Sequence, residues 1–287
     1  MEKFEFTPIG VVHSSCRYRA ESPRQGVFSS SEGEIELFPA FAGDAVADLA
    51  GFSRIWVIFC FHLNHGHSWK PRVRPPFPAS GVCRSLFATR SPYRVNPIGL
   101  SCVELTGVSD RRLFLRGIDM LDGTPVLDIK PYIPAADAFP AADAFPDASA
   151  GWRDDGGEPL PRPLSFSPLF LAQAEFLRRR GAPDLVNFAE VQLAAEPCDA
   201  SRKRVKPLDG ERWILACRTW RMIFTVDAAS GAVRLSEVLS GYRPEELAPG
   251  AEDPYRDKDL HREYETWNRR AASAAPEGKS FNNEENA

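Results

Sequence analysis

The sequence of 287 residues lacks the glycine-rich motifs of the common nucleotide-binding folds. G-x-G-x-x-G does not occur, which argues against a Rossmann site, and G-x-x-x-x-G-K-[ST] is absent, which argues against a P-loop nucleotide hydrolase. The motifs G-x-S-x-G and H-E-x-x-H are missing as well, which weakens a serine hydrolase or zinc peptidase interpretation. Any enzymatic activity must therefore rest on a different arrangement of residues.

Paired cysteines and long apolar runs are also missing. The six cysteines include no C-x-x-C pair, and most lie in apolar runs where free thiols pack as small hydrophobic side chains. The longest apolar run, residues 55–61, is too short to span a bilayer, and the start of the chain has no basic segment followed by an apolar one. These features predict a cytoplasmic protein with neither a membrane segment nor an export signal.

Composition and charge are those of a globular protein with many breaks. Hydrophobic residues make up 43% of the chain, charged residues 26%, and there are 25 prolines. Residues 244–287 hold eleven acidic and six basic side chains, a net charge of -5, so the overall charge of -4 leaves about +1 for residues 1–243. We expect an acidic, loosely ordered tail after a nearly neutral body, which can still bind nucleic acid if its cations gather on one face.

Short apolar or alternating runs separated by turns dominate residues 1–150, which we take as the first domain. They predict strands at residues 9–12, 34–37, 55–61, 85–88, 102–105, 113–118 and 126–129. Many strands with few helical stretches favour a mainly β fold, and a closed or nearly closed small β-barrel in particular, because closure removes exposed strand edges.

A second, smaller α+β domain is predicted over residues 164–243, after a linker at 151–163. Before the linker, the segment AADAFP occurs twice in tandem over residues 135–146, as expected of a tolerated loop insertion. Ser167 followed by Pro168 predicts a helix start, and Gly181 and Pro183 predict its end. Strands are expected at 213–217, 222–226 and 233–235.

Three histidines, His62, His65 and His67, follow the apolar run at 55–61. Three imidazoles in one loop could hold zinc or a similar metal and support a metal-dependent hydrolase. A polar loop at the mouth of a barrel explains them equally simply, and no Cys, Asp or Glu lies close enough in sequence to complete a ligand set. We therefore expect no metal.

The densest polar chemistry lies in two turn-rich stretches, residues 88–100 and 119–132. The first contains the guanidinium groups of Arg90 and Arg94 and the amide of Asn96. The second offers three carboxylates, at Asp119, Asp122 and Asp128. Each stretch is explained by turns alone, but a rigid barrel could bring these side chains together into a site.

Basic and aromatic residues also occur together in two places. The basic residues are Lys70, Arg72, Arg74, Arg202, Lys203, Arg204 and Lys206, and the aromatic residues near them in sequence are Trp69, Tyr93 and Trp213. Cations for phosphates and aromatic faces for unstacked bases suit an RNA ligand, whereas solvated loops are the alternative.

Six motifs together resemble the TsaA-like family, to which the TrmO-type tRNA methyltransferases belong. They are Pro23-Arg24-Gln25, Phe61-His62, WKPRVRPP at 69–76, FATRS at 87–91, NPIG at 96–99 and LDGTPVLDIKPY at 121–132. The resemblance covers residues 4–150 closely and the second domain more weakly, and 244–287 has no counterpart. Val95 and the loop at 65–67 depart from the family pattern, which puts the geometry of those loops in question.

The resemblance implies a β-barrel methyltransferase, not of the Rossmann type, that uses S-adenosylmethionine as co-substrate and is usually a homodimer. Its substrate would be tRNA carrying threonylcarbamoyladenosine beside the anticodon, methylated on the 6-amino nitrogen. By motif position the donor contacts are Pro23, Arg24, Gln25, His62, Leu63, Arg90, Leu100, Leu121, Asp122, Gly123 and Thr124.

The chemistry implied is an in-line displacement that depends mainly on positioning. Asp122, or a water that it orients, is the candidate to accept the proton of the nucleophilic nitrogen, and Asn96 is the candidate to hold the modified base. A non-catalytic RNA-binding module and a metal-dependent hydrolase built on the three histidines are the alternative functions.

Overall fold

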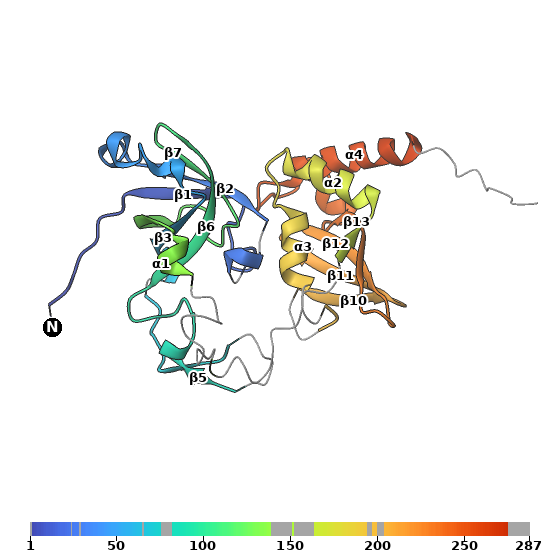
Figure 1. The fold of residues 1–287 in the computed structure, drawn as a ribbon. Coiled ribbons are helices and arrows are strands. Elements are labelled where there is room, and N and C mark those ends of the chain that lie inside the picture. The colour runs from blue at the N-terminus through green and yellow to red at the C-terminus, as the bar shows by residue number, and fades with distance from the viewer. Residues whose placement is uncertain are drawn as a thin grey trace, which may run out of the picture.

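The computed structural model contains two folded units that lie side by side (Figure 1). The structure describes residues 2–23, 25–28, 30–64, 66–75, 82–138, 151, 164–193, 197–199 and 204–274.

The first unit is a closed six-stranded barrel in which every pair of neighbouring strands is antiparallel. The strands follow one another around the barrel in the order β1, β2, β7, β6, β3, β8, and β8 pairs back to β1. Their bounds are β1 Gly10–Ser14, β2 Glu32–Leu37, β3 Arg54–Cys60, β6 Ile98–Ser109, β7 Arg112–Arg116 and β8 Pro125–Pro131. The prediction of a mainly β protein with a small barrel is confirmed.

The barrel closes because its strands alternate between inward and outward residues. In β3 the side chains of Ile55, Val57 and Phe59 are buried, while their neighbours are only half-buried. Outside the barrel, Trp56 donates to Asp137 of the short helix α1 (Pro134–Asp137), with 3.2 Å between Nε1 and Oδ2. The outward-facing Trp56 of β3 therefore has a partner in this helix.

The predicted strand at 85–88 is wrong for most of its length. Only Arg84–Ser85 form a strand, β5, which pairs with β4 (Arg72–Val73) in a separate two-stranded sheet. Leu86–Ala88 instead form a single 3₁₀ turn, in which Leu86 is buried and Thr89 closes the turn with its N–H. A short apolar run fits a buried turn as well as a strand, and periodicity alone could not separate them.

Short 3₁₀ turns occur in the loops. They are Gly26–Phe28, Pro39–Phe41, Gly43–Ala45, Leu49–Gly51, His62–Asn64, Leu86–Ala88 and Pro244–Leu247.

The second unit is a five-stranded sheet covered by helices, and it contains more strands than the sequence predicts. The strand order is β10, β11, β12, β13, β9, antiparallel except for the parallel pair β13 and β9. The bounds are β9 Leu164–Phe166, α2 Pro168–Arg178, α3 Leu185–Leu193, β10 Val205–Asp209, β11 Arg212–Cys217, β12 Trp220–Val226 and β13 Val233–Ser240. The predicted start of α2 is confirmed, because the Ser167 hydroxyl accepts the Phe170 N–H at 2.9 Å.

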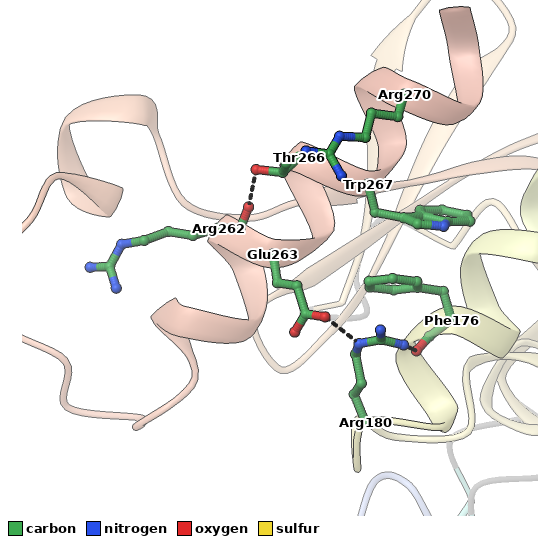
Figure 2. A pocket seen from close by; sticks show the side chains of 7 residues that line it. All are labelled: Phe176, Arg180, Arg262, Glu263, Thr266, Trp267 and Arg270. Atoms are coloured by element: carbon green, nitrogen blue, oxygen red, sulfur yellow. Dashed lines mark hydrogen bonds and ion pairs between the residues drawn. The ribbon is translucent and has the colours of Figure 1, made fainter. Parts of the chain in front are cut away.

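The expectation of a loosely ordered segment from residue 244 is wrong as far as residue 274. Helix α4 (Lys258–Ala274) packs on α2, and its Tyr264 is fully buried in the core of the second unit. Figure 2 shows the contact, in which Trp267 stacks on Phe176 with 4.4 Å between ring centroids and Arg180 pairs with Glu263 at 2.7 Å. Acidic composition misled the prediction, because the helix keeps its charges on one side and its aromatic residues on the other.

The two units contact each other through α3 and the turn between β11 and β12. Gln192 of α3 donates to the Ala20 carbonyl at 3.0 Å, and Ser30 donates to Glu190 at 3.2 Å. Arg218, in the turn, pairs with Glu21 of the barrel unit, with 2.5 Å between Nε and Oε1. Helix α3 lies on the side of the second unit that faces the barrel (Figure 1).

Candidate functional site

Barrel topology brings the predicted donor residues to one end of the barrel. Because neighbouring strands are antiparallel, the ends of β1, β7 and β3 and the starts of β2, β6 and β8 all lie at the same end. The predicted residues follow β1, follow β3, or lie at or before the starts of β6 and β8. Four segments that are far apart in sequence therefore converge on one rim, which we call the site rim.

The first group on the site rim is organised by Asp119. The carboxylate of Asp119 accepts the Ser101 hydroxyl at 2.6 Å and the Gly26 N–H at 3.0 Å. Burial raises the pKa of Asp119 above its ordinary value, although the hydrogen bonds from Ser101 and Gly26 and the charge of Arg90 act in the opposite direction. Arg90 in turn donates to the side chain of Gln25 at 2.7 Å.

Gly26 is required at its position by the closeness of the neighbouring backbone. A Cβ atom there would lie 2.1 Å from the carbonyl oxygen of Gly117. The segment after β1 is therefore pressed against the loop after β7, and Ser22 reinforces the contact by donating to the Asp119 carbonyl at 2.5 Å.

The second group is a tight turn formed by residues 121–124. The N–H of Thr124 donates to the Leu121 carbonyl at 3.2 Å, and Gly123 has a φ of 76°, as a type II β-turn requires at this position. The Thr124 hydroxyl lies 3.4 Å from Nδ1 of His62. The predicted residues His62 and Thr124 therefore touch, and the loop 117–124 contacts both groups.

Two predicted donor residues expose apolar side chains on the site rim. Leu63 is 45% exposed and Leu100 is 61% exposed. Arg19, which the sequence did not single out, donates to the Leu63 carbonyl and to the Tyr93 hydroxyl, the latter at 3.3 Å. Exposed leucines beside fixed polar groups suit an amphipathic ligand.

The Asp122 side chain points to the β1–β2 side of the rim. One carboxylate oxygen accepts the Ser14 N–H at 3.2 Å and lies 3.9 Å from Nδ1 of His13. Asp122 and His13 line an open groove of about 480 Å³ with Arg17, Glu32, Glu34 and Phe114. Within the described residues, the structure gives no contact between Asp122 and the exposed Asn96, so their joint role stays a prediction.

Other predicted residues lie outside the described residues or have different partners. Arg24 and His65 are not among the described residues, and neither are Arg202 and Lys203. His67 packs edge-on against Tyr93, with 5.6 Å between ring centroids. Among the described residues, no group of three or more His, Cys, Asp or Glu is placed to hold a metal ion.

The basic and aromatic clusters separate in the structure. Arg72 donates to the Cys83 carbonyl at 2.6 Å, and Trp69 is 50% exposed. Trp213, by contrast, packs against the core of the second unit. The sequence therefore overestimated the aromatic surface that is free to stack on bases.

The central place of Asp119 was missed, although this carboxylate stands among the three that the sequence offers in its loop. Its partners Ser101 and Gly26 lie 18 and 93 residues away. Only the closed barrel, not the local sequence, brings them together.

A family model described as the N-terminal domain of tRNA-methyltransferase O matches residues 11–138. The crystal structure of TrmO from Pseudomonas aeruginosa superposes with a TM-score of 0.59 and 30% identity, and the match covers 83% of this chain and 99% of that one. The chain belongs to the TrmO family. The match extends past residue 138, so it includes part of the second unit as well as the barrel.

Curated relatives match less than half of the chain. The tRNA (adenine(37)-N6)-methyltransferase of Escherichia coli K12 is 41% identical over 131 residues, which are 44% of this chain and 56% of that protein. A probable S-adenosyl-L-methionine-binding protein of Methanothermobacter thermautotrophicus is 44% identical over 118 residues, 41% of this chain and 82% of that protein. The chain thus spans about half the length of the first of these relatives.

Proposed function

We propose that this protein is a methyltransferase that uses S-adenosylmethionine to methylate the 6-amino nitrogen of threonylcarbamoyladenosine beside the tRNA anticodon. The E. coli relative is named for adenine N6 methylation of tRNA, and the archaeal relative for binding the donor. We place the reaction in the cytoplasm and expect a homodimer.

The observation that carries the proposal is the convergence of four sequence segments on the site rim. Gln25 meets Arg90, and His62 meets Thr124, across separations of 65 and 62 residues. These are residues that the family motifs assign to the donor. Barrel topology brings their loops to one end, and these hydrogen bonds bring the motif side chains themselves into contact.

The residues on the site rim fit the chemistry of the donor. S-adenosylmethionine carries an apolar adenine face, a charged amino acid end and an electrophilic methyl group. Leu63 and Leu100 offer exposed apolar surface, while Gln25 and Arg90 offer amide and guanidinium groups. Pro23, which is buried, and the backbone of the turn at 121–124 would complete the contact.

The protein residues contribute positioning and proton transfer. Holding both reactants in line converts a bimolecular reaction into an effectively unimolecular one, which accounts for a large part of the rate. Asp122 is our candidate to accept the proton, because its carboxylate lines an open groove and is fixed by the Ser14 N–H. Asn96, exposed before β6, is our candidate to hold the modified base.

Methyl transfer to two pools of the same tRNA tests the proposal. One pool carries threonylcarbamoyladenosine and the other is unmodified, and nucleoside mass spectrometry reads the product. We expect methylation of the modified pool alone. Transfer to neither pool despite donor binding would reject this substrate, and absence of donor binding as well would favour a non-catalytic RNA-binding module.

The role of Asp122 has its own test. Asp122→Asn keeps the size of the side chain and its bond from Ser14 but removes the base, so turnover at saturating donor and tRNA should fall by about 10²-fold or more. Normal turnover of this variant would show that another group accepts the proton.

Near-stoichiometric zinc or iron in protein prepared without chelators would instead support the metal-dependent hydrolase interpretation.

A further inference from the structure

We propose that Arg218, in the second unit, is a positioning residue for donor binding in the barrel. It acts by fixing residues 15–23 and 25–26, which we call the donor loop because they include Pro23 and Gln25. This inference rests on the proposed function, since it assigns the donor to the site rim.

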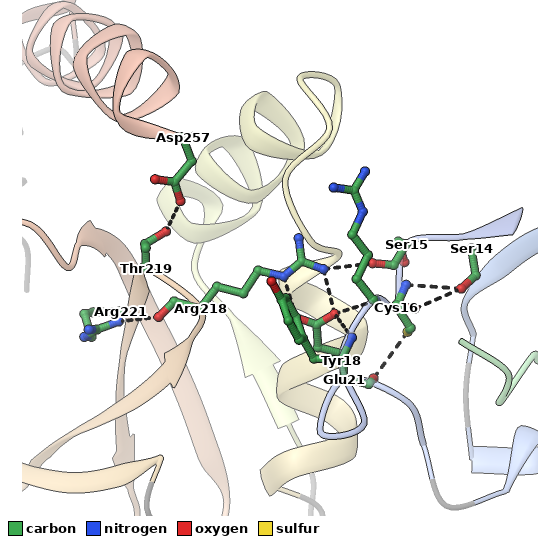
Figure 3. A network of polar contacts seen from close by, with 10 residues as sticks. Ser14, Ser15, Cys16, Tyr18, Glu21, Arg218, Thr219, Arg221 and Asp257 are labelled. Atoms are coloured by element: carbon green, nitrogen blue, oxygen red, sulfur yellow. Dashed lines mark hydrogen bonds and ion pairs between the residues drawn. The ribbon is translucent and has the colours of Figure 1, made fainter. Parts of the chain in front are cut away.

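Arg218 and Glu21 form a two-point ion pair between the two units (Figure 3). The Nε atom of Arg218 lies 2.5 Å from one Glu21 carboxylate oxygen, and Nη2 lies 2.7 Å from the other. Only 6% of the Glu21 side chain and 19% of the Arg218 side chain are exposed. The paired geometry fixes the orientation of both groups, not only their distance.

Glu21 passes this restraint to the backbone of the donor loop. Its carboxylate also accepts the N–H groups of Arg17 and Tyr18, at 2.8 and 3.1 Å. The Glu21 N–H returns to the Tyr18 carbonyl at 2.8 Å, and the Glu21 carbonyl accepts from the thiol of Cys16 at 3.4 Å. One buried carboxylate therefore closes the first half of the loop around itself.

The second half of the loop leads directly into the candidate donor site. Ser22 and Gly26 both bond to Asp119, and Gln25, between them, accepts from Arg90. Glu21 is the residue immediately before Ser22, so a displaced Glu21 carries the start of this half of the loop with it.

Arg218 is itself held firmly in the second unit. Its backbone lies in the left-handed region, with a φ of 50°, and Arg221 donates to its carbonyl at 3.0 Å. The next residue, Thr219, donates to Asp257 at 2.6 Å, so the turn is tied to the segment that leads into α4. The ring of Tyr18 lies 5.1 Å below the guanidinium.

Loss of Arg218 should change the structure of the donor loop and not that of the second unit. Removing the guanidinium leaves a buried carboxylate without its cation, and such a group regains water only if the surrounding structure opens. The segment that can open is the loop, because Thr219 and Arg221 still fix the turn in the second unit.

The test compares three variants of the full-length protein. Arg218→Met removes the charge at similar length, and Arg218→Lys keeps the charge but not the two-point geometry. Arg212→Met is the control for loss of a two-point ion pair, because Arg212 forms an exposed pair of this kind with Asp209 in the same sheet, at 2.7 and 2.5 Å, and within the described residues it has no contact with the barrel. Calorimetric titration with S-adenosylmethionine, steady-state kinetics and thermal unfolding are measured for each.

We expect Arg218→Met to bind the donor about tenfold more weakly, Arg218→Lys to be intermediate and Arg212→Met to match the unaltered protein. The KM for the donor should rise with little change in kcat, which a general loss of folded protein would not produce. Unchanged donor affinity and KM in Arg218→Met would overturn the positioning role alone. An unaltered protein that binds no donor would overturn the proposed function and this inference together.

If Arg218→Met fails to fold, hydrogen exchange in Arg218→Lys decides. The amides of Arg17 and Tyr18, which Glu21 accepts, should exchange faster than in Arg212→Met. Equal exchange in the two variants would overturn the inference.

Discussion

The barrel unit and the second unit place their polar side chains differently. In the barrel unit the core is apolar and the polar side chains lie in the loops at one rim, where Glu21 is buried but Arg90 and Asp122 can meet a ligand. In the second unit, Gln173 and His261 lie inside, fully buried and each with two hydrogen-bond partners. A buried polar group with satisfied bonds specifies packing, and an exposed one held by a rigid frame is available for binding.

His261 illustrates the structural use. Its Nδ1 lies 2.7 Å from the Ser240 hydroxyl and its Nε2 lies 3.0 Å from the Thr219 hydroxyl, while its ring stacks on Trp220 at 3.6 Å. Serine, histidine and a nearby Asp257 suggest catalysis at first sight. The fully buried ring and its two hydrogen-bonded nitrogens instead indicate a structural role, which is to attach α4 to the sheet.

Disrupting the packing between Trp220 and His261 should give the largest loss of stability. Trp220→Ala should destabilise the second unit by about 3–5 kcal/mol, because it deletes a fully buried ring and its stack on His261. Thermal unfolding followed by near-ultraviolet circular dichroism measures the loss. Trp69→Ala, at a half-exposed site, is the control and should change little; equal losses in the two variants would show that the stack contributes nothing.

Acidification should then change the stability of the two units in opposite directions. Burial lowers the pKa of His261 from 6.5 to about 4, so between these values the unfolded chain binds a proton that the folded one refuses. Stability is therefore full above pH 6.5 and falls towards pH 4, by up to about 3 kcal/mol. The raised pKa of Asp119 in the barrel has the opposite sign, since it favours the folded state on acidification.

Unfolding curves at intervals between pH 7 and 4 measure this effect. His261→Gln, which does not titrate, should flatten the pH dependence of the second unit. A slope unchanged by that substitution would assign the acid sensitivity to other groups.

The smallest effect on stability, with a clear effect on function, is expected at the site rim. Arg90→Ala removes a guanidinium that bonds only to Gln25 among the described residues, so the melting temperature should hardly change. Donor affinity should fall by about tenfold, because a charged hydrogen-bond partner is lost. Arg112→Ala, at an exposed ion pair on β7, should leave both quantities unchanged; a similar loss of affinity there would point to long-range charge effects.

Much of the barrel could be predicted because local patterns and global structure agree. The runs at 9–12, 34–37 and 126–129 overlap real strands, and their alternation matches the inward and outward faces. Ser167 and Pro168 mark the start of α2 correctly, because capping is a local effect. Among the motif residues, the structure brings Gln25 into contact with Arg90 and His62 into contact with Thr124.

What could not be predicted depends on contacts distant in sequence. Glu21 and Arg218 are separated by 197 residues, and neither lies in a motif. The strands at Leu164–Phe166 and Val205–Asp209 are short edge strands that become strands only by pairing with β13 and β11. The sequence predicts a tail where helix α4 forms, because charged residues and not the aromatic face dominate the composition of this segment.

The pairing order of the strands also dictates when each unit can be completed during synthesis. β1 begins at residue 10 but closes the barrel only against β8, which ends at residue 131. Likewise β9, at residues 164–166, waits for β13, which ends at residue 240. A ribosome synthesises the N-terminal unit first, so the barrel can close well before the structure around Arg218 has formed. Strand pairings between residues so distant in sequence also form slowly. The ion pair between Arg218 and Glu21 is therefore among the last contacts to form. The donor loop reaches its final structure only when the second unit packs against the barrel.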